Sequence, residues 1–371
     1  MRVLHVYKTY FPETQGGLEE VIRQIALETT ARGVTNRILT LAADGGPTTI
    51  DRPEARVVRC HRDAEIASNG LSMQALPRFR GHAQWADLIH YHHPWPFADL
   101  LHCLFRPSAP ALVTYHSDIV RQRRLFALYR PLMHRFLARV DRVVATSGNY
   151  AASSQVLQRY HQKTEIIPIG VDSASQPTAT SAEIAAMRAR VGSGFFLFIG
   201  VLRSYKGLDT LVDAATGTDV PVVIAGDGPE RDALQRRANA AGSGRVHFLG
   251  RVSDSERSAL FALAGAVVLP SNARSEAYGV ALVEGAMNAR ALISTELGTG
   301  TTFVNRDGET GRVVAPNDVH ALRAALEEFA NHPERTRALG VAARERYERL
   351  LTADRMGSAY MALYERLLGI A

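Results

Sequence analysis

Short apolar runs alternate with amphipathic stretches along almost the whole chain of 371 residues. Runs such as Val3–Tyr7 and Arg142–Thr146 have the length and composition of buried strands, and helical patterns such as Leu18–Arg32 lie between them. Strands that alternate with helices build parallel sheets with helices on both faces. This pattern therefore predicts an α/β fold.

The alternation stops at Val171–Ser181, a stretch rich in Ser, Thr and Ala without periodicity, and then restarts at Phe195. A break of this kind is typical of a linker. We therefore expect two doubly wound, Rossmann-like domains that face a cleft, formed by residues 1–172 and 182–353. Ligands in such folds bind beyond the carboxyl ends of the strands, where the motifs below are located.

Composition narrows the class of partner and the compartment. The formal net charge of +6 favours phosphorylated ligands, an anionic membrane surface or nucleic acid. The two cysteines, Cys60 and Cys103, form no metal-binding spacing and no disulfide framework, which favours a reducing compartment. Because neither a signal peptide nor a membrane-spanning run is recognised, we expect a cytoplasmic protein and leave peripheral membrane contact open.

Two carboxylates, Glu276 and Glu284, lie eight positions apart around the start of an apolar helix. If the whole segment is helical, both lie near one face, about 12 Å apart along the axis. That is too far for a carboxylate pair that cleaves a glycosidic bond, which needs roughly 5–9.5 Å. The helix start at Tyr278, Gly279 and Val280 offers free N–H groups to an anion. This order favours one extended ligand, such as a sugar joined through a diphosphate to a ribose.

A basic pair, Arg203 and Lys206, follows the strand Phe195–Ile199. Arg neutralises a diphosphate by forked hydrogen bonds and Lys as a point charge. The alternative is an ordinary solvated basic loop. Placement opposite the Glu276 helix favours the ligand-binding interpretation.

Glycines follow two further strands. Gly16 and Gly17 open the first helix and permit close backbone approach to a ligand, although the G-x-G-x-x-G spacing is absent and an ordinary turn would look the same. Asp227 and Gly228 resemble a nucleotide-binding turn, but a plain strand-to-helix turn explains them too. No D-x-D metal motif occurs in the sequence.

Histidines collect near two strand ends of the first domain. His116 ends a strand at the expected cleft, where it either contacts a ligand or serves a structural role. His90, His92 and His93 look like a metal cluster, but no acidic or cysteine partner has a suitable spacing. We therefore predict no metal site, although one of these histidines could line the cleft.

A basic amphipathic stretch covers Ile119–Val140. It suits the surface of an anionic membrane. A helix that packs one face on the core and exposes the other gives the same pattern, so both interpretations stay open. Its six arginines are Arg121, Arg123, Arg124, Arg130, Arg135 and Arg139.

Taken in order, these motifs resemble the retaining glycosyltransferases of family 4, which have the GT-B fold. The resemblance covers nearly the whole chain. It is carried by Gly16-Gly17, Ile167-Pro168-Ile169-Gly170-Val171-Asp172, Arg203…Lys206-Gly207, Gly226-Asp227-Gly228-Pro229, Phe248-Leu249-Gly250 and Glu276…Glu284.

The resemblance implies a metal-independent transfer, without a cofactor, that retains anomeric configuration. The second domain would bind a nucleotide-diphospho-sugar and the first domain an acceptor, with the C-terminal helix 354–371 crossing back to the first. The implied roles are diphosphate binding by Arg203 and Lys206, sugar contacts by Glu276 and His116, ribose contacts by Glu284, and backbone contacts near Gly17 and Gly279.

One element departs from many relatives, which have Gly-Gly-x-x-Glu where this chain has Leu297–Asn305. This version looks like that of bacterial O-antigen mannosyl- and rhamnosyltransferases. It points to GDP-mannose or GDP-rhamnose as donor and to a polyprenyl-diphosphate-linked glycan at the inner membrane face as acceptor.

Two other functions remain as alternatives. A nucleotide-sugar 2-epimerase of similar shape would turn over its substrate without an acceptor. A catalytically silent subunit would bind a glycan or a partner, although the joint presence of Arg203, Lys206, Glu276 and Glu284 argues against it. Nucleic-acid binding is not expected, because only the net charge supports it.

Overall fold

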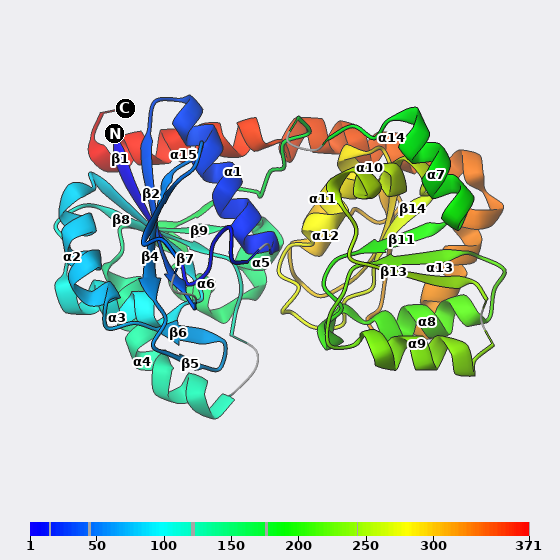
Figure 1. Cartoon of the computed structure of the whole chain (residues 1–371), viewed down its shortest axis with the longest axis horizontal. Coiled ribbons are helices and arrows are strands. Elements are labelled where there is room, and N and C mark those ends of the chain that lie inside the picture. Colours follow the sequence, from blue (N-terminus) through cyan, green and yellow to red (C-terminus); the bar gives the residue numbers. More distant parts are fainter. Residues whose placement is uncertain (15, 44–45, 120–122, 175–176, 243, 371) are drawn as a thin grey trace. The chain divides into compact units, whose positions relative to one another are not determined.

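The chain folds into two compact units, which are coloured along the sequence in Figure 1. The computed structural model describes all residues except 15, 44–45, 120–122, 175–176, 243 and 371. Unit 1 comprises Met1–Gly170 and Ala353–Ala371, and unit 2 comprises Val171–Thr352. Each unit has a largely parallel sheet with helices between its strands, which confirms the predicted α/β class.

The sheet of unit 1 has eight strands in the order β10-β9-β8-β7-β1-β2-β4-β3. All neighbours are parallel except β3 and β4. Every side chain of β7 and β8 is buried, as expected for strands covered on both faces. The strands are β1 (Arg2–Val6), β2 (Thr35–Ala42), β3 (Thr49–Asp51), β4 (Arg56–His61), β7 (Leu88–His93), β8 (Ala111–Tyr115), β9 (Arg142–Ala145) and β10 (Thr164–Ile166).

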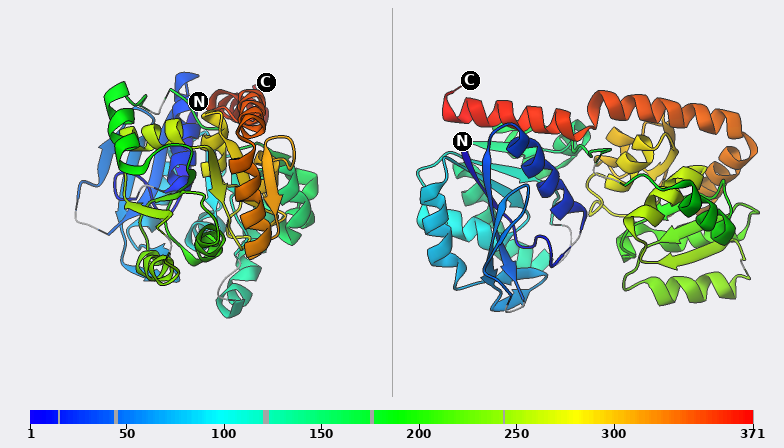
Figure 2. Two further views of the ribbon diagram at one scale, coloured as in Figure 1. Left: turned by 90° about the vertical axis from the view of Figure 1, so that its right-hand side faces the viewer. Right: turned by 45° about the horizontal axis from the view of Figure 1, so that its top comes forward.

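The C-terminal helix α15 (Ala353–Leu368) packs beside α1 (Gly17–Ala31) in unit 1, as Figure 2 shows. Gly357 permits this approach, because a Cβ atom there would lie 2.4 Å from Cβ of Glu28. Tyr360 and Tyr364 are buried on the inner face of α15. The other helices of unit 1 are α2 (Ala75–Trp85), α3 (Pro96–Phe105), α4 (Arg123–Arg139), α5 (Gly148–Ser153), α6 (Gln155–Arg159) and the 3-10 turn η1 (His161–Lys163).

The sheet of unit 2 has six parallel strands in the order β13-β12-β11-β14-β15-β16. The strands are β11 (Phe196–Ile199), β12 (Val222–Ala225), β13 (Val246–Gly250), β14 (Ala266–Leu269), β15 (Ala291–Thr295) and β16 (Gly311–Val314). The helices are α7 (Ser181–Val191), η2 (Ser204–Lys206), α8 (Leu208–Thr216), α9 (Arg231–Ala240), α10 (Asp254–Leu263), α11 (Val280–Met287), α12 (Thr301–Val304), α13 (Val319–Asn331) and α14 (Pro333–Leu350).

Glycines bring the loops at the carboxyl ends of these strands into direct backbone contact. Gly207 has φ +63°, and a Cβ atom there would lie 2.1 Å from the carbonyl oxygen of Pro270, beyond β14. A Cβ atom on Gly226, after β12, would lie 1.9 Å from the carbonyl oxygen of Gly200, after β11. Since any side chain would separate these backbones, the glycines fix the loop that holds Arg203.

Two local features differ from the expectation. The stretch Val171–Ser181 is not a free linker from its start, because the N–H of Val171 donates to the carbonyl of Leu351 at 3.0 Å and Val171 forms a parallel bridge with Thr352. Residues 175–176 of this stretch lie outside the described chain. The hairpin of β5 (Ala64–Ile66) and β6 (Asn69–Leu71) was not predicted, because these strands are too short to show a period.

Candidate functional site

Lys206 and Glu276 meet at the carboxyl edge of the unit 2 sheet. Lys206 ends the turn η2 after β11, and Glu276 lies in the loop after β14. The Nζ of Lys206 donates to Oε2 of Glu276, and Oγ of Ser271 donates to the same oxygen at 3.1 Å. Glu276 is only 8% exposed, so its carboxylate is held by two donors in a largely dry environment.

The charge of Lys206 depends on this partner. Burial by itself lowers the pKa of the ammonium, but the carboxylate of Glu276 and the nearby Tyr205 outweigh it and leave the pKa of Lys206 above its usual value. Arg203 is exposed, and within the described chain no ion pair of its side chain is found. At this edge of the sheet, the charge of Lys206 is therefore neutralised by Glu276, whereas Arg203 is exposed to solvent.

Glu276 and Glu284 do not share one helix. The helix α11 begins at Val280, the last of the three residues where its start was predicted, but Gly279 before it has φ +85° and Glu276 lies in a non-helical loop. The expected helical spacing of the two carboxylates is therefore wrong, because the left-handed residue interrupts the helical path between them. Among the described residues, the N–H groups of Gly279, Val280 and Ala281 have no hydrogen-bond partner, which leaves them available to an anion.

Glu284 is paired with a residue that the sequence analysis missed. It lies in α11, is 6% exposed, and accepts a bond from Nη2 of Arg257 in α10. No sequence signal identifies Arg257, since an arginine on an amphipathic helix normally faces solvent. The carboxylate of Glu284 can bind a ligand only by sharing or leaving this guanidinium.

The element Leu297–Asn305, which departs from the family pattern, packs on the Glu276 loop. Oγ1 of Thr299 donates to the carbonyl of Glu276 at 2.8 Å. The N–H of Gly300 donates to the carbonyl of Ala277 at 2.8 Å, and a Cβ atom on Gly300 would lie 2.6 Å from the ring of Tyr278. This element therefore fixes the position of Glu276.

Asp227 and Gly228 lie at the neighbouring strand end. The carboxylate of Asp227 is partly exposed, 3.7 Å from Arg231 and 3.9 Å from Arg251. A Cβ atom on Gly228 would lie 2.4 Å from the carbonyl oxygen of Leu202. The structure thus gives the glycine a packing role, and nucleotide binding by this turn stays a prediction.

In unit 1, Gly16 caps the N-terminus of α1 and Gly17 is its first residue. A side chain on Gly16 would meet the carboxylate of Glu19, which is buried and accepts from Oγ1 of Thr9 at 2.8 Å. Glu19 was not singled out from the sequence. Residue 15 of this predicted loop lies outside the described chain.

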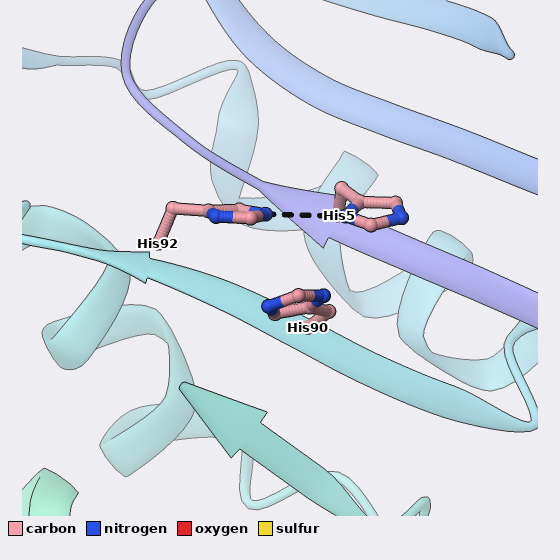
Figure 3. A group of neighbouring side chains, drawn as sticks. All are labelled: His5, His90 and His92. Atoms are coloured by element: carbon pink, nitrogen blue, oxygen red, sulfur yellow. Dashed lines mark hydrogen bonds between the residues drawn. The ribbon is translucent and has the colours of Figure 1, made fainter. Parts of the chain in front are cut away.

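His116 follows β8 and takes part in a buried chain of histidines. Its Nε2 lies 3.1 Å from Nδ1 of His92, and Nε2 of His92 lies 3.1 Å from Nδ1 of His5. Figure 3 shows His5 and His92 facing each other, with His90 alongside. His5 was not predicted as a site residue. Residues two positions apart in a strand share a face, so the sequence does place His5 on the same face of β1 as Val3.

The nitrogens of His5, His90 and His92 lie within 4.8 Å of one another, as a metal site would require. Each ring nitrogen of these three already has a hydrogen-bond partner. The rings of His90 and His92 stack face to face, with centroids 4.2 Å apart, so their lone pairs do not converge on one point. His93 points away from this group and stacks on Tyr115, with centroids 4.5 Å apart. His5 and His92 are thus hydrogen-bonded to each other and His90 stacks beside them, and the absence of a metal stays a prediction.

The basic stretch Ile119–Val140 forms α4, with residues 120–122, including Arg121, outside the described chain. Its second half packs Met133, Phe136 and Leu137 into the core. Its first half exposes Leu125 and Leu128, the latter to 81%, beside exposed arginines. Each of the two interpretations thus fits one half of the helix. No helix in the described part of the chain is long and apolar enough to cross a membrane.

Comparison with known proteins identifies the family and the fold. The sequence profile "Glycosyltransferase Family 4" matches residues 15–175, and "Glycosyl transferases group 1" matches residues 181–346. The chain is 47% identical to D-rhamnosyltransferase WbpZ of Pseudomonas aeruginosa, over 95% of this chain and 93% of that protein. It is 46% identical to O-antigen chain mannosyltransferase C of Escherichia coli, over 99% of both chains. The sucrose-phosphate synthase of Thermosynechococcus elongatus has the same GT-B fold, with a TM-score of 0.84, 21% identity and full coverage of both chains.

Proposed function

This chain belongs to the glycosyltransferases that join a family 4 domain to a group 1 domain, and on that premise we propose that it transfers mannose or rhamnose from a GDP-sugar to a lipid-linked glycan. The proposed reaction retains anomeric configuration, needs no metal or cofactor, and belongs to the synthesis of O-antigen or another surface polysaccharide. Unit 2 would bind the donor and unit 1 the acceptor.

The observation that carries the proposal is the pairing of Lys206 with buried Glu276 beside the free amides of Gly279 and Val280. A diphosphate at the start of α11 would meet those amides and two cations, Arg203 and Lys206. By taking over part of the charge of Lys206, the diphosphate would free Glu276 to accept bonds from sugar hydroxyls.

Catalysis follows from the direction in which charge moves. As the bond between the anomeric carbon and the diphosphate oxygen breaks, negative charge grows on the leaving diphosphate. Fixed cations and amides that meet this charge stabilise the transition state more than the bound donor. Two side-chain cations can thus take the place that a divalent metal has in other enzymes that transfer diphosphate-linked groups.

Three observations support the proposed donor and acceptor. One relative is named a D-rhamnosyltransferase and another an O-antigen chain mannosyltransferase. The element Leu297–Asn305, singled out in the sequence, supports the loop of Glu276, which would contact the sugar. The exposed leucines and arginines of α4 suit a peripheral position on an anionic membrane, at its cytoplasmic face, where a polyprenyl-diphosphate acceptor would lie. A nucleic-acid partner is not proposed.

A donor panel tests the proposal. GDP-mannose, GDP-D-rhamnose and UDP-glucose are each incubated with an excess of EDTA, with and without a synthetic polyprenyl-diphosphate glycan. We expect nucleotide release only with a GDP-sugar and the glycan, and a product whose anomeric configuration, read by NMR, matches that of the donor.

Each alternative has its own outcome in the same assay. Acceptor-independent conversion of the GDP-sugar to its 2-epimer would establish the epimerase. GDP binding without turnover in any arm would indicate a silent subunit. Activity that EDTA abolishes and Mn²⁺ restores would contradict metal independence.

A further inference from the structure

We propose that Asn36 sets the tautomer of His116 through His5 and His92, so that His116 presents an unprotonated Nδ1 as a hydrogen-bond acceptor. The ligand class is a sugar hydroxyl, and this last part rests on the proposed function. Asn36 lies in β2, His5 in β1, His92 in β7 and His116 just after β8, so the chain of contacts crosses four neighbouring strands.

The orientation of the Asn36 amide is fixed by its surroundings. Its Nδ2 lies 3.0 Å from the carbonyl oxygen of Ala26, which can only accept. It also lies 3.0 Å from Oγ1 of Thr29 and 2.9 Å from Oγ1 of Thr30. Both hydroxyls already donate elsewhere, to the carbonyls of Ile25 and Glu54. Three acceptors therefore surround the NH₂ group, and a flipped amide would place oxygen against oxygen.

The other end of the amide faces the first histidine. Oδ1 of Asn36 lies 3.3 Å from Nε2 of His5 and can only accept, so His5 carries its proton on Nε2. A neutral His5 then has a bare Nδ1, which accepts from Nε2 of His92 at 3.1 Å. The bare Nδ1 of His92 accepts in turn from Nε2 of His116 at 3.1 Å.

The ring geometry supports direct transmission. The rings of His5 and His92 are inclined by 17° and those of His92 and His116 by 20°, with centroids 5.4 Å apart in both pairs. Nearly parallel rings at this separation, joined through their nitrogens, meet edge to edge, with each lone pair directed at the next N–H. Figure 3 shows this relation for His5 and His92.

This proton arrangement requires neutral rings, and burial keeps them neutral. Removal from water lowers the pKa of His5 to about 4 and that of His116 to about 3. The pKa of His92 is lowered well below its usual value by burial and by the neighbouring histidines. At neutral pH each ring therefore carries a single nitrogen-bound proton. The order of donors and acceptors that Asn36 sets then holds for His5, His92 and His116 alike.

The series of hydrogen-bonded side chains that begins at Asn36 ends at Nδ1 of His116. Within the described residues no hydrogen-bond partner of this atom is found, and the residue is 6% exposed. A ligand group that donates a hydrogen bond, such as a sugar hydroxyl, satisfies it, whereas a second acceptor would be repelled. His116 is thus a hydroxyl-binding residue, and Asn36 is a positioning residue that acts through His5 and His92.

His90 is a natural internal control, because its tautomer is not determined. Its Nδ1 lies 2.8 Å from the hydroxyl of Tyr364 and its Nε2 lies 2.7 Å from Oγ1 of Thr114. Hydroxyl groups donate or accept as required, so either tautomer of His90 can be satisfied.

The direct test is a nitrogen and carbon NMR measurement on the full-length protein labelled at histidine, at pH 7.5, with resonances assigned by loss in His5→Phe, His92→Phe and His116→Gln. We expect His5, His92 and His116 all to carry the proton on Nε2. A proton on Nδ1 of His116 in the unmodified protein would overturn the inference, whatever the variants do.

Asn36→Leu removes the group that sets the direction, and Thr30→Val is its matched control. The control deletes one bond to Nδ2, but Ala26 and Thr29 still fix the amide. We expect mixed tautomers of His116 and a roughly three- to tenfold loss of turnover in Asn36→Leu, the size of one hydrogen bond, and neither change in Thr30→Val. An unchanged His116 tautomer in folded Asn36→Leu contradicts the relay.

Failure of this inference and failure of the proposed function are distinguishable. The NMR measurement needs no substrate, so it decides the relay alone. If the tautomer is as expected but no sugar donor is turned over, the proposed function is wrong and the relay stands.

Discussion

The polar cluster of His5, His90 and His92 in unit 1 is held together without charge, whereas the polar groups around Glu276 and Glu284 in unit 2 are ion pairs, although both units are doubly wound. In unit 1, His5, His90 and His92 are buried; His5 and His92 share a neutral hydrogen bond, and His90 makes neutral hydrogen bonds to Thr114 and Tyr364. In unit 2, the carboxylates Glu276 and Glu284 are buried against a lysine and an arginine. These two clusters therefore hold their polar side chains in place by different physical means.

The difference teaches what each kind of site can do. In a series of neutral histidines the tautomer of one ring fixes the tautomer of the next, since each bond has a defined donor and acceptor. Such a series supplies no charge. Buried ion pairs supply charge that a ligand can compete for. They add little net stability, because desolvation offsets their attraction, yet breaking one by removing a partner is costly. This contrast supports the proposal that unit 1 orients a neutral hydroxyl and unit 2 holds a diphosphate.

The strongest test of this contrast is Lys206→Ala. We expect kcat to fall by a factor on the order of 10²–10³, because the charge on the leaving diphosphate loses a fixed cation. The donor KM should change less. Stability should also fall, by about 3–5 kcal/mol, because Glu276 is left buried without a countercharge.

Two comparisons separate the effects on kcat and stability. Adding Glu276→Gln to Lys206→Ala should restore stability but not turnover. Arg245→Ala, which breaks an exposed pair with Asp219, should alter neither. Near-normal kcat in folded Lys206→Ala would remove this residue from the catalytic set.

The second test lowers the pH. The pKa values of His5 and His93 are lowered to about 4 and about 3 in the folded protein, against about 6.5 unfolded. The unfolded state therefore binds more protons below pH 6.5, so the stability present above that pH is lost as the pH falls toward 4. The slope is about 1.4 kcal/mol per pH unit for each histidine that titrates.

Hydrogen exchange, corrected for the intrinsic pH dependence of the rate, locates this loss. Amides of the unit 1 strands β1, β7 and β8 should lose protection between pH 6.5 and 4.5, and those of unit 2 strands β11 and β14 should lose less. Equal losses in both units would contradict the contrast between them.

The third test is Glu284→Gln. A contact to the donor ribose is much the same in the bound state and the transition state, so donor KM should rise about tenfold while kcat changes little. Glu327→Gln, at an exposed position of α13, is the matched control. A fall in kcat at unchanged KM would assign Glu284 to the transition state instead.

The smallest expected effect concerns the surface of unit 1. Leu128→Ser should weaken binding to vesicles of anionic phospholipid about tenfold, since it removes most of one exposed leucine from the apolar contact. Binding should also fall with salt, because surface charges are screened within about 10 Å at 0.1 M ionic strength. Val341→Ser, at an exposed apolar position of unit 2, should have no effect. Salt-insensitive binding would reduce α4 to an ordinary surface helix.

The architecture was predictable because it depends on periodicity. The strand–helix alternation and the start of α11 at Val280 follow from patterns within short windows of sequence. The ion pair of Lys206 with Glu276 was not predicted, since 70 positions separate the two residues and only the strand order brings their loops together.

Arg257 and His5 could not be identified as site residues from the sequence for the same reason. Arg257 has no local feature that distinguishes it from a solvated arginine. His5 looks like an interruption of an apolar strand until β7 is known to lie beside β1. Sequence reasoning thus found the residues at the strand ends and missed their partners in neighbouring elements.

The helix α15 belongs to unit 1 but follows unit 2 in the sequence. Unit 1 therefore begins to emerge from the ribosome first but cannot be completed first. The hydroxyls of Tyr360 and Tyr364, which satisfy Thr114 and His90, are translated only after all of unit 2. Until then the sheet of unit 1 lacks one of its helices, and His90 and Thr114 lack their tyrosine partners. Unit 1 therefore cannot be completed until unit 2 has been translated, and a chain cut before Ala353 would lack α15 of unit 1.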